Sequence, residues 1–145
     1  MKFIVNTDGA SRGNPGPASY GFVIKNVKGE ILYKEGKTIG VTTNNVAEYM
    51  AVLRGIEHII NTLSKSKDDL VEIITDSLLI ASQLSGRFKI KNERLMDLYF
   101  QIKGLEQHFS EISYRNVPRE QNKQADNMAN LALDGKILNQ LHLKD

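Results

Sequence analysis

The sequence predicts one α/β domain in which a mixed β-sheet is flanked by helices. The first forty residues carry β-branched and apolar runs separated by turn residues, as strands do. The apolar period then changes to that of an amphipathic helix, and strand and helix patterns alternate to the end of the domain. This order places helices on the faces of a sheet. A chain of 145 residues is long enough to bury the core of one domain.

The N-terminal part predicts an antiparallel meander. Strands are expected over residues 3–7 and 20–27, and a third begins at Ile31 and runs toward Ile39. The Lys28-Gly29 pair supplies a hairpin turn before the third strand.

Helical spacing of apolar residues from 45 to 63 predicts a long amphipathic helix. A short buried strand is expected over residues 71–75, followed by a short helix over about 77–84. These elements begin the alternation of helix and strand.

Asn92 is placed to cap a further helix, whose apolar residues recur from 95 to 109. A strand over 112–116 and a helix around Ala125 follow. We assign residues 1–135 to the domain and 136–145 to a C-terminal tail.

Composition excludes several classes of function. The chain has no cysteine, which excludes disulfides, thiolate nucleophiles and cysteine-based zinc sites. The net charge of +2 does not by itself indicate a nucleic-acid-binding protein. The apolar run at the N-terminus is too short for a signal peptide, and no run approaches the roughly 20 residues that span a bilayer. We therefore expect a cytoplasmic protein with no membrane partner. We also expect a monomer, because the sequence shows no large extra apolar surface.

Four acidic residues stand in settings where a lone carboxylate is hard to explain. Asp8 and Asp76 end apolar or β-branched runs, Glu48 continues the apolar stripe of a helix, and Asp126 lies near the start of another helix. Four converging carboxylates resist joint ionisation unless cations balance them. Oxygen ligands suit Mg²⁺ or Mn²⁺. The pattern therefore indicates metal-dependent phosphodiester chemistry.

Parallel pairing of two strands would bring these carboxylates together. If the strand before Asp76 lies parallel to the strand before Asp8, the two carboxylates end side by side. Neighbouring strands lie about 4.8 Å apart, a span that a metal ion can bridge. Glu48 precedes Val52 by four residues and therefore faces the sheet. Glu48 and Asp126 are also expected near helix N-termini, where the dipole favours negative charge.

Each acid also has an ordinary explanation. Asp76 would cap the helix that follows it, and Glu48 would close a capping box with Asn45. Asp126 would be a solvated surface residue, and Asp8 a turn residue before a glycine. All four explanations holding at once is the weaker hypothesis, because one topology brings the four residues together.

The glycine-rich segment 8–18 is not a P-loop, because it lacks the Gly-Lys-Ser/Thr ending and leads into a strand. It is either a tight loop that needs glycine or a place where the backbone approaches a polymer. In the second case, backbone groups of Gly9, Ala10 and Ser11 would contact ribose 2′-hydroxyls, which distinguish RNA from DNA.

Four motifs, at residues 7–18, 43–49, 75–77 and 122–126, together resemble type 1 ribonuclease H, and the resemblance covers residues 3 to about 133. It implies a ribonuclease H-like α/β fold. In that fold a five-stranded mixed sheet, three strands antiparallel and then two parallel, is flanked by helices.

The resemblance also implies an endoribonuclease that hydrolyses the RNA strand of RNA–DNA hybrids and leaves 5′-phosphate and 3′-hydroxyl ends. Asp8, Glu48, Asp76 and Asp126 match the four carboxylates that hold two Mg²⁺ or Mn²⁺ ions in the family.

Further residues match substrate contacts of the family. The hybrid's minor groove is expected to contact Asn14, Asn44 and Asn45. A phosphate of the DNA strand is expected to bind Thr43 and Asn92, and Asn122 is a further candidate for a substrate contact.

Two features depart from the family pattern. Many members carry a histidine in the loop before the last carboxylate, but residues 117–123 contain none. Arg119 either replaces it through phosphate contact and charge or is a plain surface arginine. The three histidines lie elsewhere, as packing or surface residues: His58, His108 and His142.

The second departure is the missing basic protrusion that some relatives insert. Only the segment 86–94 stands in its place, with Arg87, Lys89, Lys91 and Arg94. These side chains either bind backbone phosphates or form a solvated loop.

Two alternatives remain open. One is a binding module without catalysis on the same fold, although such a module would usually have lost a carboxylate. The other is an enzyme that also cuts double-stranded RNA, whose shape and 2′-hydroxyls resemble those of the hybrid. Thr43, Asn44 and Asn45 favour recognition of a DNA strand.

Overall fold

The computed structural model describes residues 1–135, and the predicted C-terminal tail, 136–145, lies outside the described residues. The elements follow the predicted order. They are β1 (Lys2–Ser11), β2 (Gly16–Lys25), β3 (Ile31–Thr42), α1 (Asn44–His58), β4 (Leu70–Thr75), α2 (Leu78–Leu84), α3 (Glu93–Glu106), β5 (Glu111–Asn116) and α4 (Lys123–Leu133). A π-helical turn, Ile59–Leu63, extends α1, and a 3₁₀ turn, Arg119–Gln121, precedes α4.

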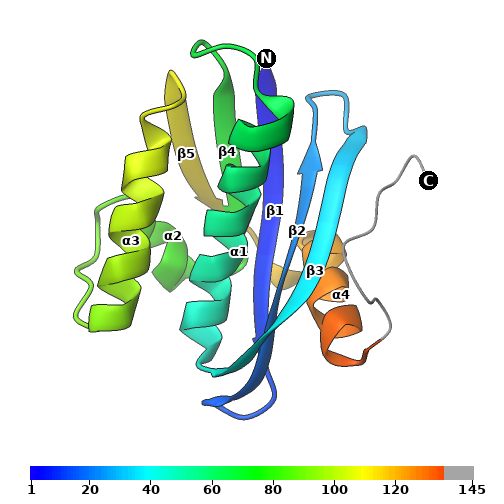
Figure 1. The fold of residues 1–145 in the computed structure, drawn as a ribbon, viewed down its shortest axis with the longest axis vertical. Helices are drawn as coiled ribbons and strands as arrows, with labels where there is room; N and C mark the ends of the chain where they lie inside the picture. Colours follow the sequence, from blue (N-terminus) through cyan, green and yellow to red (C-terminus); the bar gives the residue numbers. More distant parts are fainter. Residues whose placement is uncertain (136–145) are drawn as a thin grey trace.

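The five strands form one mixed sheet in the order β3-β2-β1-β4-β5 (Figure 1). β1, β2 and β3 pair antiparallel, as the predicted meander requires. β4 joins β1 in parallel, and β5 joins β4 in parallel. The predicted fold class is confirmed.

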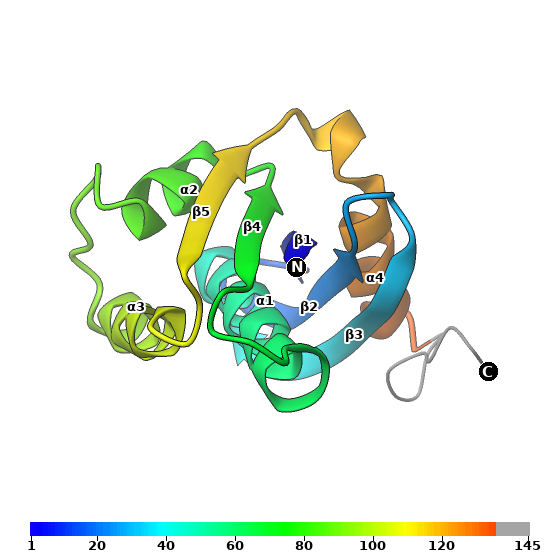
Figure 2. The ribbon, with the colours of Figure 1, turned by 90° about the horizontal axis from the view of Figure 1, so that it is seen from above.

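Helices cover both faces of this sheet (Figure 2). Side chains alternate between the faces along each strand. Val5 and Phe22 therefore point toward α1, where a Cβ on Gly55 would lie 3.3 Å from Val5 and 3.6 Å from Phe22. On the opposite face Ser19 donates a hydrogen bond of 2.6 Å to the Ala129 carbonyl of α4. The core thus has two layers of helix packed on one sheet.

Gly21 of β2 allows α4 to pack directly on the sheet. A Cβ at this position would lie 2.5 Å from the Ala125 carbonyl oxygen and 2.6 Å from the Ala129 nitrogen. Since the obstructing atoms belong to the helix backbone, a side chain here would push α4 away. This contact fixes the height of α4, and therefore of Asp126, above the sheet.

Two helix starts differ from the capping interpretations. α1 begins one residue earlier, at Asn44, because Thr43 caps it by accepting a 3.2 Å hydrogen bond from the Val46 N–H. The capping box of Glu48 with Asn45 is therefore wrong. Ser77, rather than Asp76, caps α2.

A third helix start and the first strand complete the comparison. Asn92 caps α3 by accepting from Leu95, as predicted. β1 runs on to Ser11, so Asp8 lies inside a strand, opposite Gly21, and is not a turn residue.

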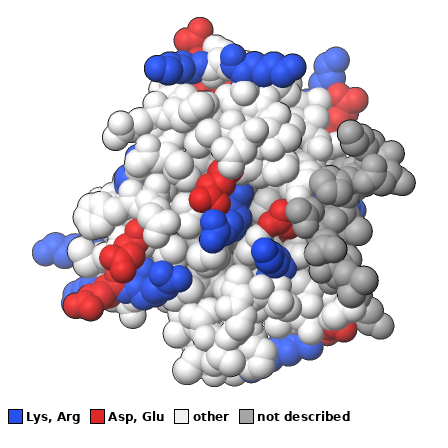
Figure 3. All heavy atoms as spheres, viewed as in Figure 1, with Lys and Arg blue, Asp and Glu red and all other residues white. Residues whose placement is uncertain are grey.

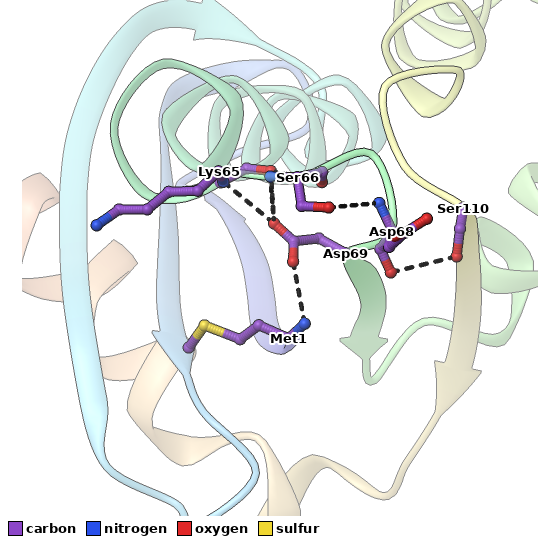
Figure 4. Close-up of polar contacts among 7 residues, drawn as sticks. Met1, Lys65, Ser66, Asp68, Asp69 and Ser110 are labelled. Carbon is purple, nitrogen blue, oxygen red and sulfur yellow. Dashed lines mark hydrogen bonds and ion pairs between the residues drawn. The ribbon is translucent and has the colours of Figure 1, made fainter.

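The N-terminal end of β1 is fastened by a buried carboxylate (Figure 4). The Asp69 carboxylate accepts hydrogen bonds from the Met1 ammonium group at 3.0 Å and from the Ser64 hydroxyl at 2.7 Å. The backbone N–H groups of Lys65 and Ser66 also donate to it, at 3.2 and 3.4 Å. This cluster holds the start of β1 beside the start of β4 and so helps to fix the parallel register.

The surface shows no single-sign field on the face drawn in Figure 3, where basic and acidic side chains are interspersed. This agrees with the small net charge of the chain, +2. Among the 135 described residues, no helix is long and apolar enough to cross a membrane.

Candidate active site

The strand register brings Asp8 and Asp76 side by side. β1 and β4 pair in parallel as far as Asn6 and Ile74, and each carboxylate lies two residues further along its chain. Each of Asp8, Glu48 and Asp76 offers an oxygen atom within 4.8 Å of those of the other two. The predicted convergence is therefore present for these three residues.

Glu48 reaches this group from α1, where it is 4% exposed. Its Oε1 accepts a 2.6 Å hydrogen bond from the Gly9 N–H, and its Oε2 accepts from the Thr75 hydroxyl at 3.4 Å. Glu48 is the fifth residue of α1 and lies beyond its first turn. The expected stabilisation by the helix dipole is therefore wrong for this residue, and local donors perform that role.

Gly9 makes this approach sterically possible. A Cβ on Gly9 would lie 2.3 Å from the Glu48 nitrogen and 2.5 Å from the Ala47 carbonyl carbon. Any side chain would therefore separate α1 from β1. The glycine-rich motif serves here to press the helix that carries Glu48 against the strand that carries Asp8.

The carboxylates are electrostatically strained. Burial raises the pKa of Asp8, and a hydrogen bond with Glu48 and the charge of Asp76 raise it further. Burial also raises the pKa of Glu48, although hydrogen bonds from Asp8 and the Gly9 N–H offset part of this rise. Burial and the neighbouring carboxylates therefore both favour the protonated forms of Asp8 and Glu48 when no cation is bound.

Asp126 stands at the margin of this group. It lies in the first turn of α4 as predicted, and close enough to Asp8 for a hydrogen bond to raise the pKa of Asp8. It does not belong to the set of oxygen atoms within 4.8 Å of one another. The Arg119 Nη2 lies 3.7 Å from its Oδ1, and the Asn130 side chain donates to the same oxygen at 3.2 Å.

Asn130 is a site residue that the sequence analysis missed. It follows Asp126 by four residues on α4, which is the spacing of neighbours on one helix face. That spacing was the available signal. Asn130 also donates to the Asp126 carbonyl at 3.0 Å, so it holds both the helix turn and the carboxylate.

All four acids line one cleft of about 360 Å³. Ala10 and Ser11 line it too, as expected for the end of β1. The other lining residues are Gly9, Arg12, Asn44, Ser77, Arg119, Asn130 and Leu133.

Two of the predicted substrate contacts are already occupied by the protein itself. The Gly9 N–H is bonded to Glu48, so it is not free for a ribose. Asn122 is only 1% exposed and donates to the Thr7 carbonyl at 2.9 Å and to Asp76 at 3.4 Å. In this structure Asn122 positions Asp76, and its contact with substrate stays a prediction.

The other predicted contacts lie at the surface beside the cleft. The Asn14 Oδ1 accepts a 2.9 Å hydrogen bond from the Asn44 N–H, so these two residues are neighbours, and Asn45 follows directly in α1. Thr43 and Asn92 cap α1 and α3, whose N-termini lie at the same end of the molecule (Figure 1). Helix N-termini present N–H groups that suit anions.

The two described histidines pack against aromatic rings, as predicted. The ring of His58 stacks on that of Tyr33 with centroids 3.6 Å apart, and His108 meets Phe109 edge to face at 5.2 Å. His142 lies outside the described residues. The basic side chains expected in place of the protrusion are all exposed: Arg87, Lys89, Lys91 and Arg94.

Comparison with known proteins places this geometry in a family. Residues 6–132 match the family described as reverse transcriptase-like. The bifunctional protein Rv2228c of Mycobacterium tuberculosis is 40% identical over 135 residues, which are 92% of this chain and 36% of that protein. The chain thus spans about a third of the length of this curated relative.

Two solved structures share the fold at similar identity. Ribonuclease H1 of the halophilic archaeon Halobacterium salinarum superposes with a TM-score of 0.87 at 37% identity, over 93% of this chain and 99% of that chain. The structure of LC11-RNase H1 in complex with an RNA/DNA hybrid gives a TM-score of 0.88 at 38% identity, over 92% of this chain and 98% of that one. The chain belongs to the reverse transcriptase-like family and, within it, to the type 1 ribonucleases H.

Proposed function

We propose that this protein is an endoribonuclease that hydrolyses the RNA strand of RNA–DNA hybrids and leaves 5′-phosphate and 3′-hydroxyl ends. The observation that carries the proposal is the convergence of Asp8, Glu48 and Asp76, with oxygen atoms within 4.8 Å of one another. Support comes from the family and from a relative of known structure that binds an RNA/DNA hybrid.

The donor set fits divalent cations. Three carboxylates supply hard oxygen atoms at bridging distances, and Asp126 lines the same cleft. We propose that the four acids hold two Mg²⁺ ions, with Mn²⁺ as a substitute. When bound, such a pair of ions activates water and stabilises the charge that develops on the phosphate.

The surrounding residues orient these acids. The Gly9 N–H and the Thr75 hydroxyl fix both oxygens of Glu48. Asn122 holds Asp76 from the buried side. Carboxylates that are locked before substrate binds lose little freedom in the reaction, which raises the rate.

We propose that the hybrid lies across the cleft with its DNA strand toward α1 and α3. Asn14, Asn44 and Asn45 would then contact the minor groove, and a DNA phosphate would bind at the helix N-termini of Thr43 and Asn92. For Arg119, whose side chain is 79% exposed, we propose a contact to a phosphate of the RNA strand.

Cleavage of an end-labelled RNA–DNA hybrid tests the proposal, beside RNA–RNA and DNA–DNA duplexes, with Mg²⁺, Mn²⁺ or EDTA. We expect cutting of the hybrid that needs either cation and stops in EDTA. Asp8→Asn should abolish it in a protein that keeps its circular dichroism spectrum. Cutting of duplex RNA as well would broaden the substrate class.

Binding of the hybrid without cutting in either cation would favour the non-catalytic module. The expectations of a cytoplasmic protein and of a monomer remain predictions. Sedimentation of the purified chain tests the second.

A further inference from the structure

Arg12 occupies a rim of the cleft that the expected substrate contacts leave out. It follows directly on β1, and its N–H donates to the Pro17 carbonyl at 2.8 Å to close the β1–β2 loop. Its guanidinium group forms an ion pair with Asp134, the residue that caps the C-terminus of α4. Arg12 therefore joins two elements that flank the cleft.

The charges of the residues that line the cleft bear on what else Arg12 can bind. Among the described residues that line the cleft, only Arg12 and Arg119 are positively charged, against four carboxylates. Both arginines pair with an acid of the α4 segment, Arg119 with Asp126 and Arg12 with Asp134. These two acids are eight residues apart, about 12 Å along a helix axis.

We propose that Arg12 is a substrate-binding residue whose guanidinium group contacts a backbone phosphate of the RNA strand, a few nucleotides from the cut. Asp134 competes with that phosphate for the same group. The inference rests on the proposed function. The RNA strand is the one concerned, because the carboxylates act on it and Arg12 lines the same cleft, whereas the proposed DNA contacts lie toward α1 and α3.

Replacing Asp134 by a phosphate as the partner of Arg12 costs little free energy. The side chains of Arg12 and Asp134 are 52% and 42% exposed, and ion pairs at such sites contribute little to stability. A guanidinium group carries five N–H donors in a planar fork that matches phosphate oxygens. Arg12 can therefore bind a phosphate through donors that the ion pair leaves to solvent, or release Asp134 altogether.

Binding of a fluorescent hybrid at several salt concentrations tests the inference. All variants carry Asp8→Asn so that the hybrid is not cut. We expect Arg12→Gln to weaken binding about 3- to 10-fold at 100 mM salt and to lower the slope of log affinity against log salt by about one. Arg12→Lys should restore the slope. Asp134→Asn should strengthen binding about 2- to 5-fold, and the double variant should resemble Arg12→Gln.

Arg54 offers a matched control. It is an exposed arginine paired at 2.6 Å with Glu57 on α1, outside the cleft. Arg54→Gln should leave both affinity and salt slope unchanged.

Two results would overturn this inference and leave the proposed function intact. One is an unchanged salt slope in Arg12→Gln. The other is equal weakening by Arg12→Gln and Asp134→Asn with matching losses of melting temperature, which would make the ion pair a structural bridge. If the protein with all native residues neither cuts nor binds the hybrid, the proposed function and this inference fail together.

Discussion

Replacing Asp8 with asparagine is expected to stabilise the metal-free protein while it abolishes cleavage. The substitution keeps the size of the side chain and removes one charge from a group of three carboxylates. The new amide can donate to Glu48, which is 4% exposed and already shares a hydrogen bond with position 8. The residue that the proposed reaction needs is thus one that destabilises the fold when no cation is bound.

The magnitude follows from the geometry. Two unit charges 4.8 Å apart repel by about 3.5 kcal/mol at an effective dielectric constant near 20. The pKa values of Asp8 and Glu48 are both raised, and protonation therefore relieves part of this repulsion. We therefore expect Asp8→Asn to raise the free energy of unfolding by about 2 kcal/mol, or the melting temperature by about 6 °C.

The increase in the free energy of unfolding that Asp8→Asn brings should depend on pH. The folded-state pKa of Asp8 is raised above its unfolded value of 3.8, chiefly by burial. Above about pH 4 the folded state therefore binds more protons than the unfolded state. The contribution of Asp8 to the free energy of unfolding is fully present at low pH and is lost as pH rises from about 4 through the folded-state pKa. Asp8→Asn removes this loss, so its advantage should be small near pH 4 and grow toward neutral pH.

Thermal unfolding in EDTA, at pH 4 to 8, measures both effects. Adding Mg²⁺ should raise the melting temperature of the unsubstituted protein and leave Asp8→Asn nearly unchanged, because the carboxylate set is incomplete. The exposed Asp97 of α3 provides the control. Asp97→Asn should alter neither the melting temperature in EDTA nor its increase on addition of Mg²⁺. A metal-free Asp8→Asn protein that melts below the unsubstituted one would refute the reasoning.

Three further predictions follow from single contacts. Asp69→Asn should cost about 2 kcal/mol at neutral pH. Hydrogen bonds, first from Ser64, lower the pKa of Asp69 to about 2, so this contribution is present above pH 4 and is lost as pH falls toward 2, as urea unfolding would show. Gly9→Ala should cost about 3 kcal/mol by chemical denaturation, because its Cβ would lie 2.3 Å from helix backbone, whereas Gly104→Ala in α3, with nothing within 4 Å, should be neutral or stabilising. Arg119→Gln should slow hybrid cleavage about 10-fold and lower the salt slope of binding by about one, with no change in melting temperature.

Each of these three predictions can be contradicted by a specific result. Asp69→Asn that unfolds like the unsubstituted protein would show that the N-terminal cluster contributes nothing. Equal stability of Gly9→Ala and Gly104→Ala would mean that α1 does not rest on β1. An unchanged rate for Arg119→Gln would leave it a plain surface arginine.

The fold was predictable because its signals are local and periodic. The β-branched and apolar runs of the first strands and the helical spacing of α1 each identify an element without reference to the rest of the chain. Element ends were less predictable. β1 extends beyond residue 7 because β2 continues to pair with it as far as Ser11 and Ala18, and that partner is not visible in a local window.

The site was predictable in its residues and less so in its contacts. Burial and parallel register explain why Asp8 and Asp76 meet, and both could be argued from strand patterns. The bonds of Asn122 to Thr7 and Asp76 join positions more than 40 residues apart, so no local pattern indicates that this side chain faces inward. A polar residue at the start of a helix looks the same in sequence whether it positions an acid or meets a ligand.

The site joins rigid and adjustable parts. Glu48 accepts the Gly9 N–H at 2.6 Å and its backbone rests against Gly9, and Asp76 accepts from the buried Asn122 amide at 3.4 Å. Asp126 instead bonds to side chains of α4 and of the exposed turn before it. We therefore expect the ion pair of Arg119 with Asp126 to be the adjustable contact of the cleft. If Asp126 helps to hold cations together with the other three carboxylates, the exposed Arg119 guanidinium group would be available to a phosphate of the substrate.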